Sequence, residues 1–342
     1  LMNSEVIGET GELKHVNRYG FFGDACNRKL SSDPVLENQR LRKWMEMLRN
    51  WNTYQTEKKD VLQRRIRKGI PDALRGRVWC LLLSADVCSD IYNKYYEDCL
   101  SKEMEEDDPF TSKGGVIDRD INRTYPQNEV FSEIGGVGQE SLRRVLLAFA
   151  NHNKEIRYTQ GMNYIVGLFL LYMSEKEAFW ALCQLMENSP FFMTKWFNQD
   201  LTMVHTSDYQ MEKLMEKYTP VVGQYLKEIN IQPVMYMTEW FMCVFSRTFP
   251  YDIVVRVWDI FLAEGWRIVY QVALALMKLN EKAIVGQEYE DVFELIRNFN
   301  GETLPPAEEL IQEALMFPIT DEELESLRKE FARTKMTRVN LS

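Results

Sequence analysis

The sequence has few of the residues that build a self-contained metal or nucleophilic site. It contains only 3 histidines in 342 residues, and none lies within ligand spacing of a cysteine or of another histidine. It has no Walker lysine motif and no GxSxG motif, and no cysteine stands beside an obvious base. We therefore expect no metal site, no cofactor of the protein's own, and no active site that works without a partner.

Paired cysteines and long apolar runs are also missing. The 6 cysteines include no CxxC pair, and several lie in apolar runs such as VWCLLL and FMCVF. The first residues do not have the basic, apolar and small-residue order of a signal peptide, so we expect a cytoplasmic protein with reduced core thiols. The longest uncharged window, residues 158–174, is shorter than the ~20 apolar residues that cross a bilayer. We predict a buried helix there and no transmembrane segment.

Excess positive charge is absent as well. The formal net charge is −10 and the isoelectric point is near 5.1, so no overall field draws the protein to nucleic acid or to an anionic membrane. Basic residues cluster between positions 64 and 77 and could bind phosphate locally, although a solvated, charged helix end is the simpler interpretation. We predict no nucleic-acid partner.

What the sequence does have is helical periodicity over most of its length. Apolar residues make up 45% of the chain, enough for one large core or two smaller lobes. No stretch alternates convincingly at period two, and the lack of a 20–50 residue repeat disfavours an α-solenoid adaptor. The pattern predicts an all-α fold, with later helices near 116–123, 139–151, 161–173, 175–187, 207–228, 233–247, 251–263, 266–283, 288–299, 306–315 and 320–333.

Two segments read as non-helical. Residues 1–34 are rich in Gly, Asn, Ser and Asp and contain one aromatic cluster, NRYGFF. Either this segment is an extended arm that docks by its rings, or it is a flexible terminus, and the sequence leaves both open. Residues 101–115 are acidic and then glycine-rich, and we predict a solvated loop.

Two short motifs each have an unremarkable explanation on their own. In IDRDINRTYP, Asp120 and Arg123 are i,i+3 neighbours on a helix, which by itself predicts a surface ion pair worth ~0–1 kcal/mol. In YTQGMN, Tyr158 and Gln160 lie just before the apolar helix, and Gln160 by itself would be a polar loop group that helps to cap it. Gln160 follows Arg123 by 37 residues.

Together with two flanking blocks, these motifs resemble the TBC (Tre-2/Bub2/Cdc16) domain family of Rab GTPase-activating proteins. IDRDINRTYP is similar to the IxxDxxR arginine-finger motif of the family, and YTQ to its YxQ glutamine-finger motif. GIPDALRGRVWCLLL resembles the opening block and VVRVWDIFLAEG the C-terminal block, in which we interpret Trp258 and Asp259 as structural. The resemblance runs from roughly Lys68 to about residue 320. Thr159 departs from the cysteine or small apolar residue that is common at its position.

The resemblance implies a TBC-type helical domain made of two helical lobes. We expect an N-terminal arm and leading helix at 1–64 and the TBC domain at 65–342. Within that domain, the lobe at about 65–190 would carry both fingers, and the second lobe would span about 191–342.

The resemblance also implies that the chain accelerates GTP hydrolysis by GTP-bound Rab GTPases in membrane trafficking, and is not an enzyme by itself. Arg123 would stabilise charge and Gln160 would orient water, while Asp120 aims Arg123 and Tyr158 fixes the Gln160 loop. Arg75 would form a supporting or a partner-facing ion pair. GTP and Mg²⁺ would be carried by the Rab, and partners would recruit the protein to endomembranes. The alternative is a catalytically silent TBC-fold Rab effector or scaffold, which the presence of both finger residues disfavours.

Overall fold

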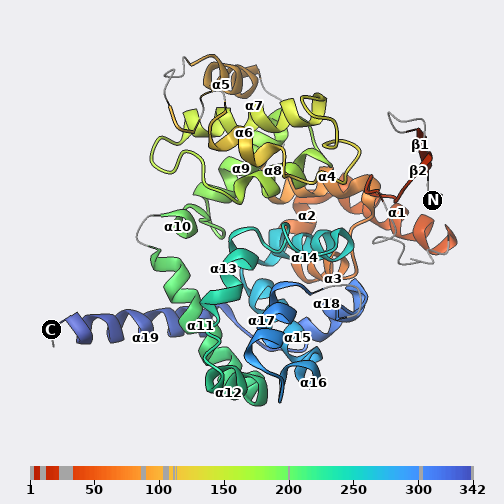
Figure 1. Cartoon of the computed structure of the whole chain (residues 1–342). Helices are drawn as coiled ribbons and strands as arrows, with labels where there is room; N and C mark the ends of the chain where they lie inside the picture. Colours follow the sequence, from red (N-terminus) through yellow and green to blue (C-terminus); the bar gives the residue numbers. More distant parts are fainter. Residues whose placement is uncertain are drawn as a thin grey trace. The chain divides into compact units, whose positions relative to one another are not determined.

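The chain folds into two compact units, Leu1–Phe192 and Met193–Ser342, and both are built almost entirely from helices (Figure 1). The computed structural model describes residues 4–7, 13–22, 34–85, 90–102, 108–110, 112, 114–198, 201–299 and 303–339. The predicted all-α fold is confirmed, with one short hairpin added at the N-terminal end. The arm and leading helix fall in the same unit as the motif-bearing helices.

The first unit begins with an antiparallel pair of strands in which Ser4 is opposite Val16. A set of helices follows, several of them short. The strands and helices of this unit are β1 Ser4–Ile7, β2 Leu13–Val16, α1 Pro34–Arg49, α2 Trp51–Thr56, α3 Lys59–Arg67, α4 Asp72–Leu82, α5 Asp90–Ser101, α6 Val116–Ile121, α7 Val137–His152, α8 Met162–Leu170 and α9 Glu175–Glu187.

In the described part of the second unit, every regular element is a helix. Its elements are α10 Thr194–Phe197, α11 Thr202–Tyr218, α12 Pro220–Glu228, α13 Val234–Met242, α14 Tyr251–Glu264, α15 Arg267–Leu279, α16 Glu281–Ile284, α17 Tyr289–Arg297, α18 Ala307–Leu315 and α19 Asp321–Val339.

Local chemistry explains where the helices differ from the sequence prediction. The single helix expected over 207–228 is divided at Thr219 because Pro220 cannot donate a backbone hydrogen bond and begins α12 instead. The helix expected to reach residue 247 ends at Met242, and Val244 and Phe245 then adopt positive φ values of 45° and 62°. α14 ends at Glu264 and is followed by Gly265, whose φ of 74° favours glycine.

Cysteine and tryptophan side chains contribute to the cores of both units. Cys80, Cys99, Cys183 and Cys243 are buried, as expected for core thiols, whereas Cys26 and Cys88 lie outside the described residues. Residues 103–107, 111 and 113 of the predicted acidic and glycine-rich loop also lie outside them. None of the described helices has both the length and the apolar character needed to cross a bilayer.

The C-terminal block of the resemblance is structural. Trp258 is fully buried in α14, and its indole N–H donates a 3.0 Å hydrogen bond to the carbonyl of Val244. The neighbouring carboxylate of Asp259 is also fully buried. This block therefore holds the second unit together and leaves no side chain of Trp258 or Asp259 exposed for a partner.

In the first unit, the opening block places α4 against the segment that follows α8. The ring of Trp79 packs edge-on against Phe169 and Tyr172, with centroids 6.3 and 5.1 Å away. Gly76 allows this approach, because a Cβ at that position would lie 1.9 Å from the carbonyl oxygen of Tyr172. The glycine of the block is therefore a packing requirement.

We expect Gly76→Ala to destabilise the protein by about 3 kcal/mol, since the backbone of Tyr172 must move to admit the methyl group. Gly223→Ala is the matched control, because a Cβ at that helical glycine would lie 3.2 Å from the Met215 side chain and no nearer than 3.4 Å to the Met215 backbone. The control is expected to change stability by less than about 1 kcal/mol. Denaturant unfolding measures both, and equal midpoints for the two variants would contradict the packing argument.

Candidate functional site

The first predicted motif forms the short helix α6 and the turn after it. Ile117 and Ile121 are buried, which fixes the face that α6 turns to the core. The helix ends at Ile121, two residues earlier than predicted, and Arg123 lies in the following turn, where its N–H donates to the Asp120 carbonyl at 3.3 Å. Contacts with α7 and α8 hold α6 in place (Figure 1).

Asp120 and Arg123 form the predicted i,i+3 ion pair, but Asp120 is not on the surface. Oδ1 of Asp120 accepts from Nε of Arg123 at 2.7 Å and lies 2.6 Å from Nη2. The Asp120 side chain is 6% exposed, while that of Arg123 is 39% exposed. A buried carboxylate therefore holds the base of a guanidinium whose tip reaches solvent.

The contact with Asp120 favours the charged form of Arg123. Burial by itself lowers the pKa of the guanidinium, but the hydrogen bond and the negative charge of Asp120 outweigh it, so the pKa of Arg123 is raised. Arginine is a cation at physiological pH in any protein, and the contact with Asp120 fixes the position of this charge.

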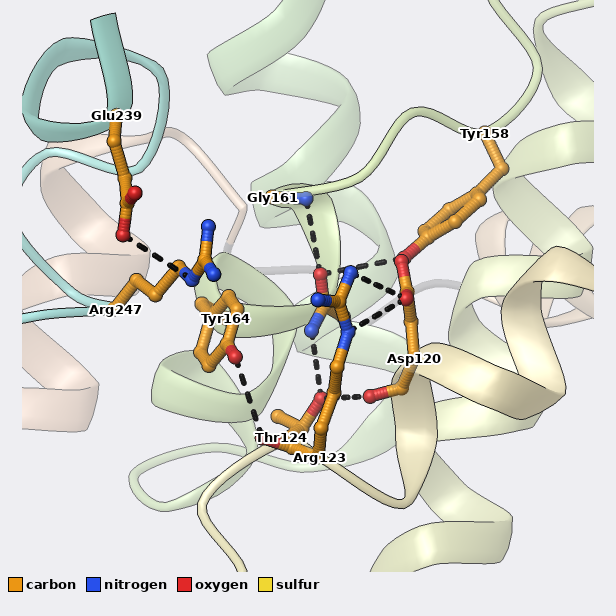
Figure 2. Close-up of polar contacts among 9 residues, drawn as sticks. Asp120, Arg123, Thr124, Tyr158, Gly161, Tyr164, Glu239 and Arg247 are labelled. Atoms are coloured by element: carbon orange, nitrogen blue, oxygen red, sulfur yellow. Dashed lines mark hydrogen bonds and ion pairs between the residues drawn. The ribbon is translucent and has the colours of Figure 1, made fainter.

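The second motif meets the first at the same carboxylate. The buried hydroxyl of Tyr158 donates a short hydrogen bond to Oδ2 of Asp120, across 38 residues of sequence (Figure 2). Asp120 thus accepts from Arg123 with one oxygen and from Tyr158 with the other. The structure brings Asp120, Arg123 and Tyr158 together as one cluster.

Two further polar residues, which sequence reasoning missed, complete the connection. Oδ1 of Asn163 accepts from the Gly161 N–H at 3.0 Å, and its Nδ2 donates to Oγ1 of Thr124 at 2.7 Å. The hydroxyl of Thr124 donates to the Asp120 carbonyl at 2.7 Å. The side chains of Thr124 and Asn163 are fully buried. An asparagine at the start of an otherwise apolar helix, as in GMNYIVG, was the available signal, because a buried amide needs partners.

Gln160 lies in the turn between these anchored residues. The N-cap of α8 is Gly161, with φ of 111°, and no side chain caps it, so the capping role considered for Gln160 is wrong. Gln160 is exposed, and no hydrogen bond ties its amide to another described residue. Its backbone is held on both sides, by Tyr158 and by Gly161, while its side chain is available to solvent.

The Arg75 side chain is buried inside the first unit and does not face a partner. Its side chain is 2% exposed, pairs with Asp72, and donates to the carbonyl of Ile70 at 2.8 Å. Its Nη1 also lies 3.2 Å from the hydroxyl of Tyr172. A side chain so covered cannot meet a partner, so the partner-facing expectation is wrong and Arg75 acts as an internal support at the start of α4.

We expect Tyr158→Phe to cost about 1–3 kcal/mol of stability, because Asp120 loses a buried donor. Tyr209→Phe is the matched control, since Tyr209 also donates to a carboxylate, that of Glu330 at 2.6 Å, but on the surface. Its expected cost is ~0–1 kcal/mol. Denaturant unfolding compares the two, and equal costs would mean that burial does not strengthen the Tyr158 contact.

Among the described residues, no group of three or more His, Cys, Asp or Glu side chains is placed to hold a metal ion. What the cluster offers is one fixed cation and one exposed amide on neighbouring segments of the same unit.

The model of the Rab-GTPase-TBC domain matches residues 72–285, which include α6, the Gln160 turn and α14. The chain belongs to this family.

Relatives and solved structures agree with the family. TBC1 domain family member 10A of Mus musculus is 32% identical over 319 residues, a match that covers 91% of this chain and 62% of the relative. This chain therefore spans less than two thirds of that relative's length. The Chlamydomonas flagellar RabGAP TBC domain superimposes with a TM-score of 0.64 at 25% identity, over 87% of this chain and 99% of that one. The Ypt/Rab-GAP domain of Gyp1p gives 0.66 at 19% identity, over 82% and 98%, and supports the fold alone.

Proposed function

We propose that this TBC domain accelerates GTP hydrolysis by a Rab-family GTPase, to which it supplies Arg123 and Gln160 in trans. The observation that carries the proposal is the shared carboxylate of Asp120, which ties the arginine motif to the loop of the glutamine motif. A single buried group thus fixes the relative positions of the two segments whose side chains would have to act together.

GTP hydrolysis requires that negative charge on the transferring phosphoryl group be neutralised and that the attacking water be held in line. Arg123 suits the first requirement because its pKa is raised and its guanidinium presents a planar fork. Nε and Nη2 are engaged with Asp120, and no described residue bonds to Nη1. Arg123 can therefore keep its anchor while Nη1 binds a phosphate oxygen.

Gln160 suits the second requirement. Its amide offers donors and an acceptor at an uncharged tip, so it can orient water between phosphate and nucleophile without repelling either. The flanking anchors at Tyr158 and Gly161 limit the motion of its backbone, and this preorganises the amide for a partner. The amide itself has no competing bond among the described residues.

The partner implied by this arrangement is a GTP-bound Rab that carries its own nucleotide and Mg²⁺. The protein would then be an activator that completes a partner's active site, working from the cytoplasm on endomembranes where Rabs act. Its role would be to end Rab signals in membrane trafficking.

Multiple-turnover phosphate release against a panel of GTP-loaded Rabs tests the proposal. We expect strong stimulation of at least one Rab at substoichiometric amounts of this protein. A silent effector or scaffold would bind a GTP-loaded Rab without stimulation, and that outcome would replace the activator role. Absence of both binding and stimulation across the panel would reject a Rab-directed role.

A further inference from the structure

The N-terminal arm is docked on the segment that directly follows Arg123. The N–H of Phe22 donates to the carbonyl of Gln127 at 2.8 Å, and the N–H of Glu129 donates to the carbonyl of Gly20 at 2.7 Å. An isolated antiparallel bridge also pairs Phe21 with Asn128. Of the two alternatives for this part of the arm, the docked one is correct, although backbone bonds hold it as well as rings.

Side chains from both partners reinforce the docking. Asn128 is fully buried, and its Nδ2 donates to the carbonyl of Tyr19 at 2.9 Å. Oδ1 of Asn17 accepts from the N–H groups of Tyr19 and Phe21, at 2.9 and 3.0 Å, which shapes the arm into a tight turn. Arg18 pairs with Asp72 of α4 at 2.9 Å. Residues 17–22, the docked arm, are therefore specified by several independent contacts.

A continuous path of contacts leads from the docked arm to the backbone of Arg123. The ring of Phe21 packs edge-on against Tyr125, with centroids 5.9 Å apart. Tyr125 adopts a positive φ of 45°, and its hydroxyl donates to the Tyr164 carbonyl at 3.1 Å. The hydroxyl of Tyr164 in turn donates to the carbonyl of Arg123 at 3.3 Å. Phe21 thus covers the ring that holds the turn after Arg123 on α8.

We propose that the docked arm positions Arg123 for catalysis, as a brace supplied from outside the matched TBC region. Residues 17–22 precede that region, which begins at residue 72, yet they contact the turn that carries the arginine. The inference rests on the proposed activator function. If the arm undocks, Tyr125 loses the ring that covers it, and two backbone hydrogen bonds are broken. Arg123 would then spend less time aligned for the reaction.

Phe21→Ala tests this role, because it removes the ring and leaves the arm's backbone donors in place. We expect kcat for stimulated hydrolysis to fall about tenfold, as for a small misplacement of a catalytic group, while KM for the GTP-loaded Rab stays unchanged. Phe21→Tyr keeps the ring and is expected to restore kcat. Leu36→Ala is the matched control, since it removes an exposed apolar side chain from the nearby helix α1.

Amide hydrogen exchange provides a readout that does not depend on activity. We expect the Glu129 amide, which is bonded to Gly20, to exchange faster in Phe21→Ala than in the parent or in Leu36→Ala. A raised KM with unchanged kcat would overturn the positioning role and make the arm a Rab contact. If the parent stimulates a Rab and Phe21→Ala has the same kcat, the brace is rejected and the proposed function stands. If the parent stimulates no Rab, the proposed function is rejected.

Discussion

Replacing Arg123 by alanine is expected to lower Rab-stimulated phosphate release by about 10³- to 10⁵-fold, which corresponds to ~4–7 kcal/mol of barrier. The loss is large because a guanidinium aimed at the transferring phosphoryl group acts only as charge develops in the transition state. Single-turnover hydrolysis by a GTP-loaded Rab measures it. If Arg123→Ala stimulates hydrolysis as well as the parent, Arg123 is not the finger.

The same substitution also affects stability, since Asp120 is left buried with Tyr158 as its remaining side-chain donor. We expect a cost of about 1–3 kcal/mol, more than for a surface ion pair. The double variant Asp120→Asn/Arg123→Ala removes the buried charge and is expected to regain stability without regaining activity. This separation shows that lost activity does not arise from unfolding.

Two single variants sharpen the test of Arg123. Arg123→Lys keeps the charge but loses the planar fork, so we expect most of the activity to be lost. Arg119→Ala removes an exposed arginine from α6, the helix just before Arg123, and is expected to keep most of the activity. Equal losses in Arg119→Ala and Arg123→Ala would indicate a general charge effect on Rab association.

Gln160→Ala is expected to lower the stimulated rate on the order of 10²- to 10³-fold, as for removal of one preorganised hydrogen-bonding group. Folding should be unaffected because the exposed amide bonds to no other described residue. Binding to a GTP-loaded Rab should persist, since the backbone around Gln160 is held by Tyr158 and Gly161. Rate and affinity are measured on the same Rab.

Thr159→Ala is the matched control for Gln160→Ala, because it changes the neighbouring side chain and leaves the amide in place. A second experiment uses a Rab whose own catalytic glutamine is replaced by alanine. If Gln160 takes over the orientation of water, the parent still stimulates this Rab. Undiminished turnover by Gln160→Ala on an unmodified Rab would mean that the GTPase orients the water itself.

Helix content was predictable because apolar periodicity is local. The segment 175–187 was expected as a helix and forms α9 with the same bounds, since Ser174 and Glu177 make a capping box at its start. Boundaries failed where a single residue changes the backbone, as at Pro220, or where positive φ values end a helix, as at Val244. The hairpin of β1 and β2 was missed because its strands have 4 residues each.

Of the candidate site, the residue types and their order were predictable, but their connections were not. Thr124 and Asn163 are ordinary polar residues in sequence, and only the packing of α6 against α8 makes them bond to each other. Burial likewise decided between the alternatives for Arg75, because a basic residue in a helix predicts neither a covered nor an exposed side chain. Such outcomes depend on neighbours that are distant in sequence.

The sequence by itself determined that this is a helical chain that resembles the TBC family and carries Arg123 and Gln160 in its two motifs, because side-chain identity and helical spacing are properties of neighbouring residues. Only the tertiary structure decided that one buried carboxylate serves both motifs and that the arm docks beside Arg123. The physical reason is that these contacts join segments about 40 to 110 residues apart, and their energy is realised only when the core brings the segments together.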